Sequence, residues 1–83
     1  DRVIEDEDFE AAALAFTRSL ASGAVVAMGL AKRAIDGGLD GDLAAGLDLE
    51  AEAFVEVFRT EDARTGVASF LEQGPGKARF AGR

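Results

Sequence analysis

The spacing of apolar residues constrains the fold of this 83-residue chain more than any other feature of its sequence. Apolar side chains recur every three or four positions rather than every two, which places them along one face of a helix. The longest such series is Leu43, Leu47, Ala51, Phe54 and Phe58. The sequence therefore predicts an all-α chain without a sheet.

Breaks in the pattern divide the chain into four predicted helices, near residues 6 to 21, 24 to 36, 41 to 58 and 61 to 73. Three glycine-containing stretches mark where helices end: ASG at 21 to 23, DGG at 36 to 38, and Gly74 with Pro75. We expect residues 1–83 to form a single helical segment with a basic tail over residues 73–83.

Acidic and hydroxyl residues mark where the helices begin. The run EDED at residues 5 to 8 offers an N-cap candidate and puts negative charge at the positive end of the first helix dipole. Asp40 or Asp42 is placed to cap the third helix, and Thr60 to cap the fourth.

The chain has many apolar residues, but many of them have small side chains. Seventeen alanines and six phenylalanines stand beside one methionine and no tryptophan or tyrosine. Alanine-lined faces let helices approach closely but bury little area each, so we expect no ordinary monomer core. Some of a set of six apolar residues should be exposed, or covered by another copy of the chain. The set is Phe9, Phe16, Val25, Phe54, Phe58 and Phe70.

Composition excludes several classes of function. The chain has neither cysteine nor histidine, so it has no disulfide framework, no thiolate or imidazole metal site and no imidazole base. A net charge of −7 argues against nucleic-acid binding. The longest apolar run, residues 23 to 31, is far shorter than the ~20 residues that span a bilayer. We expect a cytoplasmic protein without membrane contact.

Four stretches, taken in order, resemble the C-terminal helical region of the crotonase superfamily, the enoyl-CoA hydratase/isomerase proteins. DRVIEDEDF at 1 to 9 resembles the segment that leaves the family's last core strand, and LASGAVVAMGLAKRAI at 20 to 35 is similar to the helix that follows. FRTEDARTGVASFLE at 58 to 72 is similar to the family pattern F-x-T-x-D-x-x-x-G-x-x-[AS]-F. The closing ARFAGR at 78 to 83 resembles its F-x-G-R ending.

The resemblance implies a region that assists catalysis without performing it. In the family, the thioester carbonyl is polarised by backbone N–H groups, and proton transfer is done by carboxylates, all of which lie in the β-rich core upstream. The resemblance therefore implies no catalytic residue in this chain, and no required cofactor beyond the coenzyme A thioester that is the parent enzyme's substrate. It also implies a homo-oligomer, either a trimer or a dimer of trimers.

Two residues are candidates for contact with coenzyme A. By register with the family pattern, Phe54 matches an aromatic residue beside the adenine, whereas its spacing along the chain favours a core residue of the third helix. The family's contact lysine corresponds to Gln73 here, so Lys77 in the GPGKA stretch is the substitute candidate for a phosphate contact. Thr65, where the family often has glutamate, is a further departure from the pattern.

A second class of function fits the same residues. A free-standing acidic helical module that binds another protein through its alanine and phenylalanine faces would show the same periodicity. The acids at Asp48, Glu52 and Glu56 stand four apart and could suggest an acid/base pair, but such acids are typical of a solvated helix face. A β-rich core encoded upstream, or supplied by a second chain, would distinguish the enzyme segment from the module.

Overall fold

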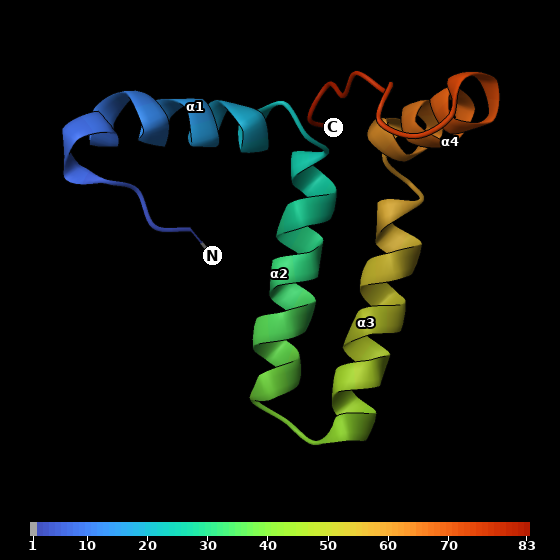
Figure 1. Ribbon diagram of the computed structural model, residues 1–83. Coiled ribbons are helices and arrows are strands. Elements are labelled where there is room, and N and C mark those ends of the chain that lie inside the picture. Colours follow the sequence, from blue (N-terminus) through green and yellow to red (C-terminus); the bar gives the residue numbers. More distant parts are fainter. Residues whose placement is uncertain (1) are drawn as a thin grey trace.

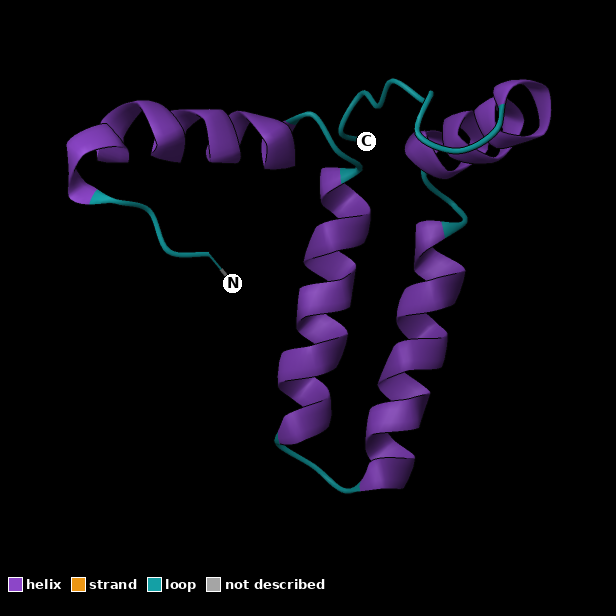
Figure 2. Ribbon diagram, in the orientation of Figure 1, coloured by secondary structure: helices purple, strands orange, loops and turns teal. Residues whose placement is uncertain are grey.

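The computed structural model describes residues 2–83, which fold into helices joined by short connections (Figure 1). The elements in order are η1 (Asp6–Asp8), a 3₁₀ turn, and the helices α1 (Phe9–Ala21), α2 (Val25–Leu39), α3 (Leu43–Val57) and α4 (Glu61–Gln73). No strand occurs among these residues (Figure 2). The prediction of an all-α chain with four helices is confirmed.

Helices α2 and α3 form an antiparallel hairpin, and this is the main packing interaction of the fold (Figure 1). Leu30 of α2 and Ala53 of α3 are the buried apolar residues of the described chain. Further along, Gly38 lies against Gly46: a Cβ placed on Gly46 would stand 3.3 Å from the Cα of Gly38. Small residues thus set how closely the two backbones approach.

Helix α2 is longer than predicted, because the DGG stretch does not end it. The helix continues through Gly37 and Gly38 to Leu39. A Cβ on Gly37 would stand 2.9 Å from the Leu49 side chain of α3. The glycines therefore let α3 pack closely against α2. This packing offsets the helix stability that each glycine loses relative to alanine, about 1 kcal/mol.

Two of the predicted helix caps form and one does not. The Asp42 carboxylate accepts a hydrogen bond from the Ala45 N–H at 2.8 Å, and the Thr60 hydroxyl accepts one from the Ala63 N–H at 3.1 Å. At the first helix, the acidic run winds into η1, and Asp8 makes no side-chain cap bond. Gly74, with φ of +80°, ends α4 as predicted.

The chain is far more open than an ordinary domain of its length. Helix α1 leaves the start of α2 at 94° (Figure 1). The radius of gyration is 15.8 Å, against about 12 Å for a compact domain of this length. The accessible surface is 6775 Å², roughly 2,000 Å² more than a folded monomer of this mass exposes. The helices do not enclose a monomer core.

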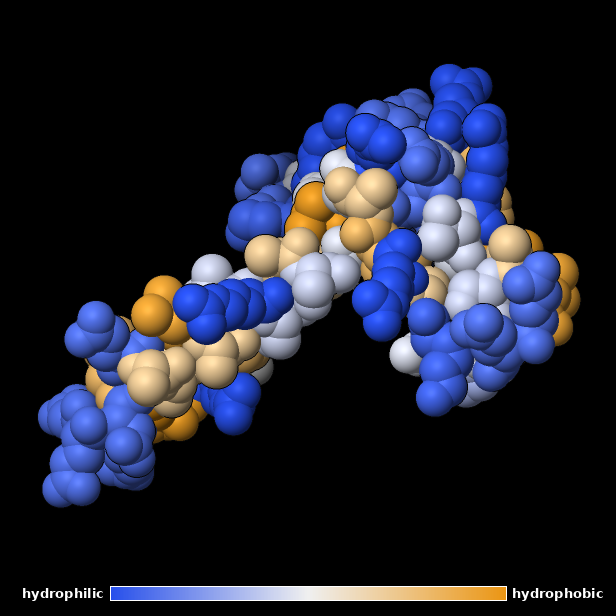
Figure 3. Space-filling model, turned by 90° about the horizontal axis from the view of Figure 1, so that it is seen from above, coloured by the Kyte–Doolittle hydropathy of each residue, from blue (hydrophilic) through white to orange (hydrophobic). Residues whose placement is uncertain are grey.

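Many large apolar side chains are exposed at the surface of the described chain. All six residues of the predicted set are exposed: Phe9, Phe16, Val25, Phe54, Phe58 and Phe70. Figure 3 shows apolar side chains at the surface of the arm that carries α1, next to hydrophilic ones. The prediction that some of these residues are exposed is confirmed. Exposed apolar surface on this scale is typical of a face that packs against another protein surface.

Candidate functional site

Phe54, the predicted adenine contact, lies on the exposed side of α3. Its side chain is 64% exposed and packs against Phe58, with ring centroids 4.9 Å apart and a tilt of 52° between the rings. It borders a hollow of about 180 Å³ between α2 and α3. The other lining residues are Ala27, Leu30, Ala31, Ala34, Glu50, Ala53 and Val57. The ring therefore stands beside an alanine-rich floor that an apolar or aromatic group can contact.

A larger groove of about 450 Å³ continues along the same two helices toward their connection. It shares Ala31, Ala34 and Glu50 with the hollow at Phe54. Its remaining lining residues are Ile35, Gly38, Leu39, Leu43, Gly46 and Leu47. Because aliphatic side chains dominate and Glu50 is the one charged group in the lining, the groove suits an apolar protein surface better than an anionic ligand.

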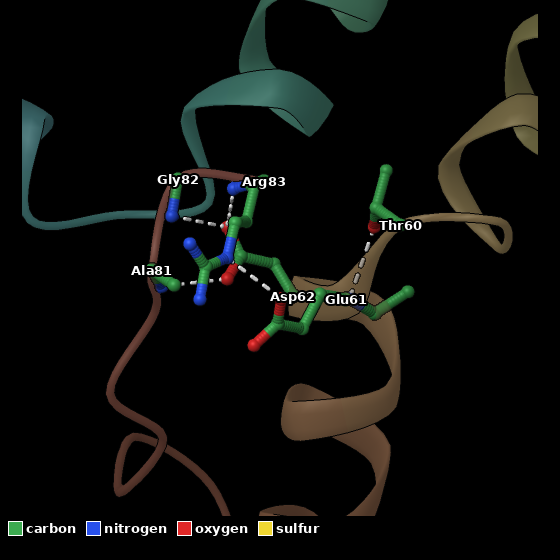
Figure 4. Close-up of polar contacts among 7 residues, drawn as sticks. Thr60, Glu61, Asp62, Ala81, Gly82 and Arg83 are labelled. Atoms are coloured by element: carbon green, nitrogen blue, oxygen red, sulfur yellow. Dashed lines mark hydrogen bonds and ion pairs between the residues drawn. The ribbon is translucent and has the colours of Figure 1, made fainter.

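The C-terminal tail returns to the first turn of α4 and is held there by Asp62 (Figure 4). The carboxylate is only 2% exposed and accepts three backbone hydrogen bonds from Ala81, Gly82 and Arg83, at 2.7, 2.8 and 3.1 Å. In return, the Asp62 N–H donates to the main-chain oxygen of Arg83 at 2.8 Å. The buried carboxylate is thus fully hydrogen-bonded by the tail.

The Arg83 side chain adds an ion pair to this contact. Its Nε donates to a Glu61 carboxylate oxygen at 2.7 Å. This hydrogen bond and the nearby negative charge raise the pKa of the Arg83 guanidinium above its already high ordinary value, so the group stays charged at any ordinary pH. One of the three tail cations is therefore engaged within the chain.

The tail also bridges α4 and the start of α2. Phe80 lies over Gly66 of α4, where an added Cβ would stand 3.4 Å from the ring, and Gly82 lies close to Val25 of α2. A hollow of about 390 Å³ forms beneath the tail loop. It is lined by Ser22, Gly23, Gly66, Ser69, Phe70, Gly74, Pro75, Gly76, Ala78 and Phe80.

Lys77, the predicted phosphate contact, is exposed on the loop between Gly76 and Ala78. Within residues 2–83 it forms no ion pair, and it borders none of the hollows described above. Phe54 and Lys77 share no hollow, so this chain alone does not bring the two candidates together. Their roles stay predictions.

Of the three acids that stand four apart on α3, one is ion-paired and the other two are exposed. Glu56 forms an ion pair with Arg33 of α2 at 2.6 Å, while Asp48 and Glu52 are exposed. No group of three or more metal-ligating side chains gathers within residues 2–83. Over the same range, no individual helix has both the length and the apolar character needed to cross a membrane.

Sequence reasoning missed Asp62 and Glu61 as the residues that hold the tail. Both lie in the first turn of α4. Two signals were available: Asp62 and Gly82 stand at the D of the F-x-T-x-D pattern and the G of the F-x-G-R ending, and the acidic first turn and the basic tail have complementary charge. The decisive donors are backbone N–H groups of residues 81–83, which carry no signature of their own in a sequence.

Comparison with known proteins relates this chain to a CoA enzyme. The chain is 34% identical over 73 residues to the short-chain-enoyl-CoA hydratase of Clostridium acetobutylicum. The chain resembles part of a hydratase. The alignment covers 88% of the chain and 28% of that enzyme, so the chain spans under a third of its relative's length. No protein-family model and no solved structure matches. The similarity agrees with the crotonase resemblance of the sequence.

Proposed function

We propose that this chain is the C-terminal helical part of an enoyl-CoA hydratase/isomerase-like protein, with roles in subunit assembly and on the coenzyme A side of the acyl-CoA site. The observation that carries the proposal is the similarity to a short-chain enoyl-CoA hydratase over 88% of the chain. The order of the family-like stretches, from DRVIEDEDF to ARFAGR, favours the C-terminal part of such an enzyme.

The open shape supports the assembly role. About 2,000 Å² of surface beyond that of a folded monomer is within the range buried by permanent interfaces between subunits. The apolar groove on α2 and α3 and the exposed phenylalanines supply the kind of surface that such interfaces bury. We propose that the β-rich core and neighbouring subunits cover these faces in a trimer or a dimer of trimers.

The coenzyme A role rests on Phe54 and on the tail. An exposed ring beside an alanine-rich hollow offers a flat apolar wall for adenine, since aromatic groups stack face to face with an offset. Because Arg83 is paired with Glu61, Lys77 is the better candidate for a phosphate contact, and Arg79 is the next. Lysine suits this task as a mobile point charge.

The chemical step belongs to residues outside this chain. Because the crotonase resemblance assigns the oxyanion donors and the catalytic carboxylates to the upstream core, we expect the isolated chain neither to hydrate an enoyl-CoA nor to bind coenzyme A tightly. The test is to assay crotonyl-CoA hydration and coenzyme A binding for the full-length protein and for residues 1–83. Activity that is confined to the full-length protein supports the proposal. Full activity of residues 1–83 alone, or neither activity nor binding in the full-length protein, would overturn it.

The alternative is a free-standing acidic module that binds another protein through the same apolar faces. The exposed surface is compatible with both functions, and the similarity to the hydratase favours the enzyme segment. The mass of the full-length polypeptide separates the two, because the module needs no β-rich core while the enzyme segment does.

A further inference from the structure

Asp62 differs from the other acids of the chain in its surroundings. It is the buried charged residue of the described chain, whereas its neighbour Glu61 is exposed. The cap of α4 is already supplied by Thr60, so the helix does not need the Asp62 carboxylate for that purpose. Instead, both oxygens of Asp62 are directed at the tail (Figure 4).

The three consecutive N–H groups of residues 81–83 form a small backbone nest for an anion, and Asp62 is the anion that fills it. The nest depends on Gly82, whose φ of +80° is unfavourable for any residue with a Cβ. Backbone hydrogen bonds to a buried carboxylate are stronger than the exposed Arg83–Glu61 ion pair, which water screens. The carboxylate is therefore the main attachment of the tail.

We propose that Asp62 is a positioning residue that fastens residues 81–83 to the start of α4 and thereby fixes the loop that carries Lys77. The loop of residues 74–80 is anchored at one end by α4 and at the other by this contact. Release of the far end would free the loop and open the hollow beneath it. The fastening stands on the contacts within this chain and does not depend on the proposed coenzyme A role.

Hydrogen exchange read by mass spectrometry on the full-length protein tests this role. Asp62→Asn keeps the size of the side chain but turns an amide N–H₂ toward backbone donors. We expect the amides of residues 81–83 to exchange at least tenfold faster, since a hydrogen-bonded charge is lost. Peptides from α2 and α3 should keep their exchange rates. The matched control is Asp48→Asn, which removes the same charge from an exposed position and should change neither region.

A second variant tests the same contact by changing the tail instead of Asp62. Gly82→Ala leaves Asp62 intact but strains the nest, and its Cβ would stand 3.3 Å from Val25, so it should loosen the same amides even if Asp62→Asn fails to fold. Glu61→Gln should change their exchange by less than about threefold, because an exposed ion pair contributes little. Unchanged protection in the Asp62 and Gly82 variants, or a larger loss in Glu61→Gln, would overturn the proposal. So would equal loosening of α2 and α3 in a folded Gly82 variant.

Discussion

At the scale of single residues, the tail cations divide into one that is engaged and two that remain available. Arg83 is paired with Glu61, while Lys77 and Arg79 form no ion pair within residues 2–83. A cation without an internal partner can give its full charge to a bound phosphate. This difference decides which residue a test of the coenzyme A role should change first.

Lys77→Ala in the full-length protein should raise the KM for an enoyl-CoA thioester by up to about tenfold, or ~1.4 kcal/mol, and leave kcat nearly unchanged. A phosphate contact far from the reacting bond is equally strong in the ground and transition states, so it acts on binding alone. Steady-state kinetics provide the measurement, with Lys32→Ala, the other lysine of the chain, as control. A loss of kcat at constant KM would refute the phosphate role.

Thr60→Ala should lower the free energy of unfolding by about 1 kcal/mol, because α4 loses the hydroxyl that caps the Ala63 N–H. Thr17→Ala is the control. The Thr17 hydroxyl bonds to the Ala13 carbonyl within α1, where alanine has the higher helix propensity, so that change should be neutral or slightly stabilising. Urea denaturation of the full-length variants measures both. If Thr60→Ala and Thr17→Ala change the free energy of unfolding equally, Thr60 does not act as a helix cap.

At the scale of elements, the hairpin of α2 and α3 depends on small residues where the backbones meet. Gly37, Gly38 and Gly46 leave room for the facing helix, while Gly29 of the same hairpin has no heavy atom within 4 Å of an added Cβ. The four glycines thus have different reasons to be present, although they look alike in the sequence.

Gly46→Val should destabilise the hairpin by about 1–3 kcal/mol, because the added side chain would push against the backbone at Gly38. Gly29→Val is the matched control and should be close to neutral, since valine slightly exceeds glycine in helix propensity and meets nothing there. Chemical denaturation followed by helical circular dichroism compares the two. If both variants are equally stable, the close approach at Gly46 does not hold the helices together.

At the scale of the whole molecule, the chain exposes more surface than a self-contained domain of its length. Its radius of gyration and its accessible surface both exceed those of a compact monomer. The two buried apolar residues, Leu30 and Ala53, cannot offset the conformational entropy of ordering four helices. Further burial has to come from another surface.

Residues 1–83 expressed alone should therefore self-associate or be partly unfolded. Sedimentation velocity should show a concentration-dependent increase in mass, or an expanded monomer with weak helical circular dichroism. In the full-length protein, Phe58 should be shielded from solvent. A compact and stable monomer of residues 1–83 that buries every phenylalanine would instead favour the free-standing module.

The sequence by itself determined the features that arise from hydrogen bonds within one turn. The Thr60 cap joins residues three apart, and so does the cap of α3, for which the sequence allowed either Asp40 or Asp42 and the structure has Asp42. The stop at Gly74 follows from its backbone freedom. For the same reason, the all-α character and the span of α4 were predictable from the spacing of apolar residues. Phe54 and Lys77 were likewise placed on a helix and on a loop, but the spacing does not determine where the two side chains lie relative to one another, and within residues 2–83 the folded chain gives them no common hollow.

Contacts between residues that are distant in the chain could be found only from the tertiary structure. It carries α2 through Gly37 and Gly38, because Leu49 and Gly46 of the facing helix fit against them. It also assigns Asp62 to backbone donors 19 to 21 residues away. A helix signal is local and repeats along the chain, whereas such a contact depends on where α4 and the tail come to lie. Every residue except proline carries the same backbone N–H group, so the sequence does not reveal which of these groups will bind the Asp62 carboxylate.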